Sequence, residues 1–238
     1  MSPTPPILTP RLQQIANTIT PCACMADIGT DHAYLPVYLC MTGVCKRGIA
    51  SDIRRGPLQR AKDTLRRYGM ESRIETRLGG GVDTLAPGEA DCIVIAGMGG
   101  LMIAEILKAN PTVFAKSGQI LLQPMTAVPE LRSFLWENGY TVVSETLAKE
   151  EQKLYHILAV EVGQEPTPPT PTELYLGQRL LTDRPEHFAE YLQKQRRKLT
   201  RMAEGLKQSQ SEDTALRLKE TLALLDAIEA LEKEEHSC

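Results

Sequence analysis

The sequence lacks any hydrophobic stretch long enough to cross a membrane. Of its 238 residues, 42% are hydrophobic and 24% are charged, as in an ordinary globular protein. No run approaches the roughly 18 apolar residues of a transmembrane helix. The N-terminal segment MSPTPPILTPRLQQIA also lacks the basic and apolar regions of a secretory signal. We therefore expect a protein that has no membrane partner and stays in the cytoplasm.

The cysteine patterns of disulfide-rich and zinc-binding proteins are also missing. The six cysteines form no C-x-x-C pair, and four of them lie inside apolar runs. A reduced cysteine in such a run behaves as a small hydrophobic residue. We expect neither a disulfide framework nor a metal site.

An overall excess of positive charge is absent too. The chain has 27 Lys and Arg against 30 Asp and Glu, a net charge of -3, which taken alone argues against a nucleic-acid partner. The charges are nevertheless segregated along the chain. Between Lys46 and Arg77, ten basic residues stand against four acidic ones, and between Lys194 and Lys207 six basic residues stand against Glu204. These two segments are candidates for contact with a polyanion.

Short apolar runs alternate with helix-like segments up to about residue 162, which is typical of a parallel sheet in an α/β domain. Strands are expected at 22–27, 47–51, 74–77, 92–96, 119–123, 141–147 and 154–162, and helices near 33–42, 57–68, 100–109 and 128–138. The last two strands leave no room for a helix between them. This predicts an antiparallel hairpin that closes one edge of the sheet.

A cluster of four prolines at 166–171 follows the last strand. Such a cluster is incompatible with a helix interior or a central strand and indicates a stiff linker. We therefore divide the chain into a domain at 1–165, a linker at 166–171 and a C-terminal region at 172–238. In this last region, apolar residues recur at helical spacing on both sides of a polar break at 208–213. The pattern predicts a coiled-coil-like hairpin of two antiparallel helices.

The first predicted strand ends in an acid and a glycine, Asp27 and Gly29, just before a predicted helix. This is where α/β sheets bind nucleotides, but the dinucleotide fingerprint requires a second glycine where this chain has Asp31. A carboxylate there would repel a pyrophosphate and would suit a cationic ligand. S-adenosylmethionine carries a sulfonium and an ammonium group and no phosphate, so the charge pattern favours it over NAD.

The next strands also end in acids or glycines. Asp52 ends the second strand, where a carboxylate can accept hydrogen bonds from ribose hydroxyls. Gly79-Gly80-Gly81 follows the third strand, and Gly97-Met98-Gly99-Gly100 follows the fourth. Parallel strands present these ends on one edge of the sheet, so a shared site is expected there. The alternative is purely structural: the glycines form turns, and Asp27 or Asp31 caps the following helix.

Several longer motifs resemble, in order, the bacterial tRNA (adenine-22) N1-methyltransferase family. They are Arg11-Leu12, MADIGTDHAYLP at 25–36, GEAD at 88–91, IAGMGG at 95–100 and LQP at 122–124. The resemblance runs the full length of the chain, including the helical hairpin. It implies a Rossmann-like class I methyltransferase fold, a mostly parallel seven-stranded sheet with an antiparallel C-terminal edge strand. It also implies S-adenosylmethionine as donor and N1 of adenine 22 in tRNA as acceptor.

The resemblance also implies roles for individual residues. The methionine end of the cofactor would be bound by Asp27, Gly29, Asp31 and His32. Its ribose would be bound by Asp52 and the neighbouring Ile53, and its adenine would lie near Gly80 and Gly81. Gly97 and Met98 would form the floor of the pocket. Arg11, Tyr34, Gln123 and Pro124 would lie on the substrate side. The chain departs from the family pattern at Gly80, where an Asp is usual, and at Met125, where Asn is frequent. Asp83 could replace the missing acid.

The fourth strand ends without the N-P-P-aromatic motif of enzymes that methylate exocyclic amines, and no cysteine nucleophile for carbon methylation follows it. Such a site suits a nucleophile with an exposed lone pair, such as adenine N1, and direct in-line transfer. Because N1-methylation leaves the adenine cationic, a nearby carboxylate would stabilise the product. Asp31 is the candidate catalytic residue, to orient the amino group or accept its proton.

Phosphate contacts are expected from basic residues in both basic segments, namely Arg54, Arg55, Lys62 and Arg66 in the first and Lys194, Arg196 and Arg197 in the second. The competing interpretation is that these residues occupy ordinary solvated helix faces. A monomer is favoured, although the apolar seam of the hairpin could also form a dimer.

Two other functions stay open at this point. One is a methyltransferase that acts on another RNA or on a small molecule with the same donor. The other is a non-catalytic S-adenosylmethionine-binding module whose hairpin binds a protein. A nicotinamide oxidoreductase ranks last because Asp31 opposes a pyrophosphate.

Overall fold

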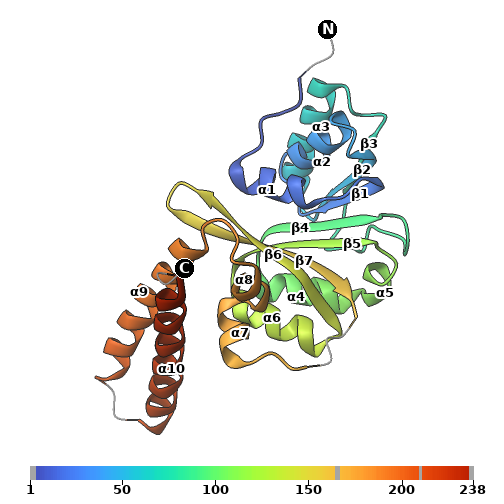
Figure 1. The fold of residues 1–238 in the computed structure, drawn as a ribbon. Helices are drawn as coiled ribbons and strands as arrows, with labels where there is room; N and C mark the ends of the chain where they lie inside the picture. Colours follow the sequence, from blue (N-terminus) through green and yellow to red (C-terminus); the bar gives the residue numbers. More distant parts are fainter. Residues whose placement is uncertain (1–3, 164–166, 209–210, 236–238) are drawn as a thin grey trace.

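A computed structural model describes residues 4–163, 167–208 and 211–235. Seven strands form one sheet in the order β3-β2-β1-β4-β5-β7-β6 (Figure 1). Their bounds are β1 Cys22–Ile28, β2 Cys45–Asp52, β3 Ile74–Leu78, β4 Cys92–Gly99, β5 Gln119–Thr126, β6 Tyr140–Glu150 and β7 Lys153–Val162. The first five are parallel, and β7 pairs antiparallel with both β5 and β6. The predicted α/β fold with a closing antiparallel hairpin is confirmed.

Within that hairpin, β6 forms the outer edge and β7, the C-terminal strand, lies one place further in. The pattern of apolar and polar positions in these two strands did not show which of them forms the edge, because both strands alternate. A register shift between Val142 and Ser144 interrupts the ladder, and such an irregularity bends an edge strand.

Six helices pack on the two faces of the sheet: α1 Pro10–Thr18, α2 Tyr34–Met41, α3 Arg55–Tyr68, α4 Gly100–Ala109, α5 Pro111–Phe114 and α6 Val128–Glu137. Buried residues of α1, α2 and α3 form one hydrophobic core, and buried residues of α4, α5 and α6 form another on the opposite face. Figure 1 shows these groups on either side of the strands. Since both faces are covered, the central strands are apolar at almost every position, as the short apolar runs predicted.

The region after the linker contains more helices than the periodicity predicted. Two short helices, α7 Pro171–Leu176 and α8 Gln178–Asp183, precede the long pair α9 Phe188–Leu206 and α10 Glu212–Glu235. Pro171, expected in the linker, is the first residue of α7, where proline is favoured because its missing N–H would have no helical partner. Thr170 and Glu173 form a reciprocal capping box at this helix start. Pro166 lies outside the described residues.

The two long helices form the expected antiparallel hairpin and lie side by side away from β1, β2 and β3 (Figure 1). The third hydrophobic core includes Leu199 of α9 and Ile228 of α10, together with Leu147 of β6. The base of the hairpin is thus packed on the sheet. Met202 and Leu222, expected in the seam, are 38% and 40% exposed. Among the described residues, no helix combines the length and apolar character needed to cross a membrane.

Candidate cofactor and methyl-transfer site

Two backbone hydrogen bonds join the carboxyl ends of β1 and β2. The N–H groups of Gly29 and Thr30 donate to the carbonyl of Ser51 at 2.8 and 2.9 Å. Gly29 has a φ of 77°, and a Cβ at this position would collide with the end of the Met98 side chain. The turn after β1 therefore needs glycine and brings it against the end of β4.

The alternative that the acids of this loop cap the following helix is wrong. Just before α2, the hydroxyl of Thr30 accepts a hydrogen bond from the backbone N–H of Ala33 at 3.1 Å, and no side chain of the described residues caps the helix start. Ala33 itself, in the left-handed region at φ 55°, occupies the N-cap position. Asp27 and Asp31 are thus left for other partners.

Asp27 is a buried acid with few partners. Its exposed fraction is 9%, and burial raises the pKa of its carboxyl to about 6, an effect that the Thr30 hydrogen bond and the positive charge of Arg11 oppose and nearby Asp52 reinforces. An ionised carboxylate in such a place favours a cation, because a positive ligand would replace the lost hydration.

Asp52 is also buried, at 5% exposure. One of its carboxylate oxygens accepts a hydrogen bond from the backbone N–H of Arg54 at 2.7 Å and lies 3.6 Å from the Arg54 Nε. The hydroxyl of neighbouring Ser51 is buried and has no hydrogen-bond partner. The end of β2 therefore presents acceptor capacity that the protein itself does not fully use.

Asp31, in contrast, lies at the surface of the same edge. Its side chain is 60% exposed and forms a close ion pair with Arg60 of α3. The His32 Nε2 lies 3.5 Å from the other carboxylate oxygen. His32 in turn stacks on Tyr34, with ring centroids 5.3 Å apart. The structure thus brings the predicted residues Asp31, His32 and Tyr34 together, and adds Arg60, which the charge pattern alone did not pair with them.

The glycines after β3 leave space beside the end of β2. A Cβ on Gly80 would meet only Ile53 Cδ1 at 3.5 Å and Asp83 Oδ2 at 3.8 Å, both ordinary contacts. Asp83 is held by a 2.7 Å hydrogen bond from the Asn110 side chain. The acid considered as a replacement for the missing Asp therefore faces the position of Gly80. Gly81 has a φ of 50° and packs on Ile106.

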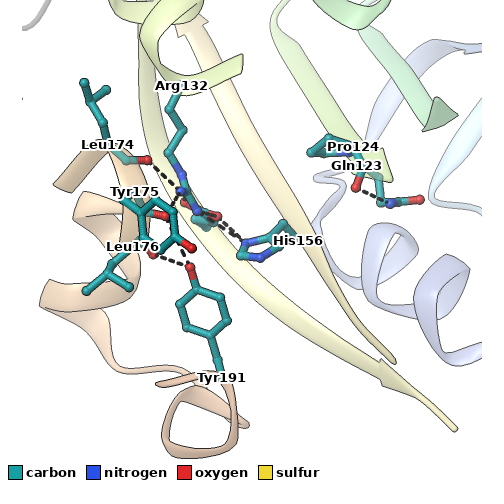
Figure 2. Close-up of polar contacts among 9 residues, drawn as sticks. Gln123, Pro124, Arg132, His156, Leu174, Tyr175, Leu176 and Tyr191 are labelled. Carbon is teal, nitrogen blue, oxygen red and sulfur yellow. Dashed lines mark hydrogen bonds and ion pairs between the residues drawn. The ribbon is translucent and has the colours of Figure 1, made fainter. Parts of the chain in front are cut away.

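At the end of β4, the buried side chain of Gln123 organises the backbone. Its carbonyl oxygen accepts hydrogen bonds from the Gly97 N–H at 3.1 Å and from Arg11 Nη1 at 2.6 Å. The same amide donates to the Pro124 carbonyl at 2.9 Å (Figure 2). The Arg11 guanidinium also lies over the Tyr155 ring, 5.7 Å from its centroid. The residues predicted on the substrate side, Arg11, Gln123 and Pro124, thus form one connected group.

Large apolar side chains at this edge are unusually exposed. They follow β2, β3, β4 and β5 and comprise Ile53 at 71%, Leu78 at 51%, Leu101 at 62%, Met102 at 59% and Met125 at 45%. Scattered exposed hydrophobic residues are ordinary, but a group of them around one edge marks a binding surface. Of this set, sequence reasoning named only Ile53 as a site residue and Met125 as a departure from the family pattern, because exposure at a strand end depends on how the neighbouring loops pack.

Comparisons with known proteins identify the family of this chain. The model of the family described as tRNA (adenine(22)-N(1))-methyltransferase matches residues 25–227. This chain belongs to the tRNA (adenine(22)-N(1))-methyltransferase family. The enzyme of that name from Bacillus subtilis is 39% identical over 156 residues, which are 66% of this chain and 66% of that protein. The predicted family is therefore confirmed.

Solved structures of family members extend the similarity to the C-terminal helices. The crystal structure of the Bacillus subtilis m1A22 tRNA methyltransferase superposes with a TM-score of 0.84 at 31% identity and covers 94% of this chain and 98% of that chain. A Streptococcus pneumoniae protein described as a putative tRNA (m1A22) methyltransferase, in complex with S-adenosyl-L-methionine, gives a TM-score of 0.83 at 29% identity, over 94% and 99% of the two chains. The chain thus has the fold of an S-adenosylmethionine-dependent methyltransferase.

Several of the basic residues that were predicted to bind RNA in this family member have partners within the chain. Arg54 pairs with Asp52, Arg66 with Asp63 and Glu71, and Arg196 with Glu232. Lys194 donates to the Gln152 carbonyl at 2.6 Å and lies 3.1 Å from Glu190. For Arg55, Lys62 and Arg197, all exposed, no ion pair is found among the described residues. Of the seven basic residues predicted to contact RNA, these three are therefore the most available to a polyanion.

A buried polar cluster that periodicity did not reveal joins the catalytic sheet to the C-terminal helices. Arg132 of α6 donates to Glu145 of β6 at 2.5 and 3.1 Å and to the carbonyls of Leu174 and Tyr175 at 2.9 Å. His156 of β7 lies 2.7 Å from Glu145. Figure 2 shows Arg132 between the α7 carbonyls and His156. Although burial opposes ionisation, Arg132 and His156 hold the pKa of Glu145 at about 2.

Tyr191 of α9 completes this cluster. Its hydroxyl donates to the Leu176 carbonyl at 3.1 Å, and its ring meets the edge of His156 with centroids 5.1 Å apart. Gly177 is required beside it: its φ is 98°, and a Cβ would lie 2.8 Å from both Arg132 and Glu145. Every charged group in the cluster has a partner, so its role is to hold α7 and α9 against the sheet.

Proposed function

We propose that this protein transfers a methyl group from S-adenosylmethionine to N1 of adenine 22 in tRNA at the carboxyl edge of its parallel strands. The observation that carries the proposal is the family match over residues 25–227, whose bounds span every strand end of the site. The chemistry of that edge supports it independently.

The residues at the edge fit the donor. Asp27 is a buried carboxylate with spare capacity for a cation, which suits the ammonium group of the methionine end. Asp52 and the unpartnered Ser51 hydroxyl supply acceptors for ribose hydroxyls. Ile53 offers an exposed apolar surface for a purine ring, and Asp83, beside the space at Gly80, offers an acceptor for its amino group.

The acceptor base is assigned to the β4 and β5 side of the edge. The backbone there runs through Gly97 and Met98, and the oxygen of the nearby Gln123 amide is already bonded to Gly97 and Arg11. Such a surface positions a base by shape and stacking. It suits adenine N1, whose lone pair needs no deprotonation before attack.

When bound, S-adenosylmethionine supplies the methyl group: the N1 lone pair forms the new N–C bond as the S–C bond breaks, which leaves S-adenosylhomocysteine and a cationic 1-methyladenine. We assign to Asp31 the stabilisation of the positive charge on the methylated adenine. Its carboxylate lies at the rim of the edge with Arg60 and His32. There it can stabilise the positive base or accept a proton from the amino group.

For the RNA we assign the exposed basic residues of the two basic segments, above all Arg55, Lys62 and Arg197. Phosphate contacts of this kind supply affinity without sequence information. They must offset the few kcal/mol that exposing a stacked base costs.

We also propose that the protein acts as a monomer, because Leu199 and Ile228 of the hairpin seam are buried within one chain. We further propose that the reaction needs no metal ion. Light scattering on the purified protein, and activity in the presence of EDTA, test these two points.

The decisive experiment incubates the purified protein with labelled S-adenosylmethionine and a tRNA transcript that has adenine or guanine at position 22. Label is expected in 1-methyladenosine from the adenine transcript only. Equal labelling of both transcripts would point to another RNA position. If S-adenosylmethionine binds but neither transcript is methylated, a non-catalytic binding role replaces the proposal.

A further inference from the structure

A second pocket adjoins the proposed methyl-transfer site on the side away from the cofactor residues. It has a volume of about 320 Å³, at the lower end of the range for ligand sites. Its walls come from the end of β5, the β6–β7 turn with the start of β7, and α9, including Met125, Lys153, Tyr155 and Lys194. It thus lies where the sheet and the hairpin meet, between segments that are far apart in the sequence.

The pocket is connected to the proposed acceptor site by direct contacts. Tyr155 lines the pocket, and the Arg11 guanidinium lies over its ring. Arg11 donates a hydrogen bond to the Gln123 side chain, which also accepts one from the Gly97 N–H. Pro124, the next residue after Gln123, also lines the pocket. If one base of an RNA strand lies at the end of β4, an adjacent nucleotide of the same strand would therefore lie at this pocket.

The charge of the pocket suits a phosphate. Lys194 is held by the Gln152 carbonyl and by Glu190, which also pairs with Lys149 at 2.7 Å. Lys153, by contrast, is exposed, and its ammonium group has no hydrogen bond or ion pair within the described ranges. Glu150 stands opposite it in the β6–β7 register, yet no ion pair joins the two. The ammonium group of Lys153 is thus available to an external anion.

The pocket also has an apolar wall. Met125 is 45% exposed, although it follows two buried residues, Gln123 and Pro124. Leu154 and Tyr155 are half-buried on the neighbouring strand. A nucleotide presents both a phosphate and an apolar base face, and single-stranded RNA is bound through such a combination of a cation and stacking surfaces.

We propose that this pocket binds a tRNA nucleotide directly next to the target adenine, with Lys153 on its phosphate and Met125 and Tyr155 against its base. The proposal rests on the proposed function, because the neighbouring nucleotide is defined by adenine 22. It assigns the β6–β7 turn, rather than the outer faces of the hairpin, to the contact nearest the methylated base.

The test compares Lys153→Gln with Lys116→Gln as the matched control. Lys116 is also an exposed lysine and lies before β5, at the amino-terminal edge of the parallel strands. Lys153→Gln is expected to weaken tRNA binding by about threefold to tenfold and to lower the slope of log Kd against log salt by about one. The affinity for S-adenosylmethionine should not change. Met125→Ala should raise the KM for tRNA without altering the salt slope.

A chemically altered tRNA locates the contact. A neutral methylphosphonate at either phosphate beside adenine 22 should weaken binding to the wild-type protein and have no further effect on Lys153→Gln. Additive effects of the two changes, or a Lys153→Gln protein that behaves like Lys116→Gln, would overturn the inference while the wild type still methylates adenine 22. A wild-type protein that does not methylate adenine 22 would instead overturn the proposed function.

Discussion

Two of the buried carboxylates in this molecule, Glu145 and Asp27, have different environments, and the difference separates function from architecture. Glu145, at 1% exposure, is surrounded by Arg132 and His156, which hold its pKa at about 2. Asp27, at 9% exposure, has a pKa raised to about 6, because burial outweighs the help of Thr30 and Arg11. The first acid is satisfied by the protein, and the second is not.

The difference between these two acids distinguishes a structural role of a buried carboxylate from a ligand-binding role. An acid whose partners are all internal stabilises the packing that places those partners together, here α6, β6, β7 and α7. An acid that is buried without enough partners costs stability in the free protein, and the cost is recovered when a cationic ligand binds. This contrast supports the proposed place of Asp27 in the cofactor site, whereas Glu145 belongs to the junction with the hairpin.

The largest expected effect comes from breaking the satisfied cluster. Glu145→Gln should lower the free energy of unfolding by about 3–5 kcal/mol, because it leaves the buried Arg132 without its counter-charge. Glu161→Gln, which changes an exposed glutamate of β7, is the control. Chemical denaturation measures both. Equal stability of the two variants would mean that the cluster does not hold the junction.

Asp27→Asn should have the opposite effect on stability. The free protein is expected to become more stable at pH 8 by roughly 1–3 kcal/mol, because an unfavourable buried charge is removed. The affinity for S-adenosylmethionine should fall about 100-fold, as for the loss of a charged hydrogen-bond partner. Asp183→Asn, at an exposed aspartate, controls for the charge change. Calorimetry with and without the donor gives both quantities, and unchanged donor affinity would remove Asp27 from the site.

The two acids should also give opposite pH dependences. The raised pKa of Asp27 means that the folded protein loses stability as the pH rises from about 4 to 6. The lowered pKa of Glu145 means that its contribution is present above its ordinary value of 4.5 and is lost as the pH falls towards 2. Donor affinity should decrease by about tenfold per pH unit below about pH 6, where Asp27 becomes protonated. Asp27→Asn should show no such decrease.

The smallest effect is expected at the exposed acid of the same edge. Asp31→Asn should lower kcat by about tenfold, less than is usual for a buried catalytic group, because water screens a side chain that is 60% exposed. Arg60→Ala, which removes its ion-pair partner, is the comparison. Single-turnover measurements at saturating donor separate binding from chemistry. Full turnover of Asp31→Asn with weakened donor binding would exclude the catalytic role.

Much of the fold was predictable because the strands are buried on both faces. Their apolar runs, such as Cys92 to Ile95, are visible in the sequence without knowledge of the partners. The candidate site was predictable for a related reason, since acids and glycines at parallel strand ends necessarily meet at one edge. The short helices α1, α5, α7 and α8 were not predicted, because segments of four to nine residues show few helical periods and none of these four lies where an α/β alternation requires a connecting helix.

The roles of charged residues were predicted less well. Arg54, Arg66, Lys194 and Arg196 belong to basic segments of the sequence, but each has an internal partner. Arg132 and Glu145 are thirteen positions apart on a helix and a strand, a spacing with no periodic signature. Pairing between charges depends on distances that only the packed chain establishes.

The sequence by itself determined the α/β fold, the helical hairpin, the family and the strand ends at which the site lies, because these follow from local patterning and from motifs that lie along the chain. The tertiary structure decided which buried acids have partners within the protein, that neither Asp27 nor Asp31 caps α2, and that a pocket lined by the exposed Lys153 opens beside the proposed acceptor site. The physical reason is that burial and electrostatic pairing are properties of neighbours in space, and the energy of a charge depends on those neighbours more than on its own place in the chain.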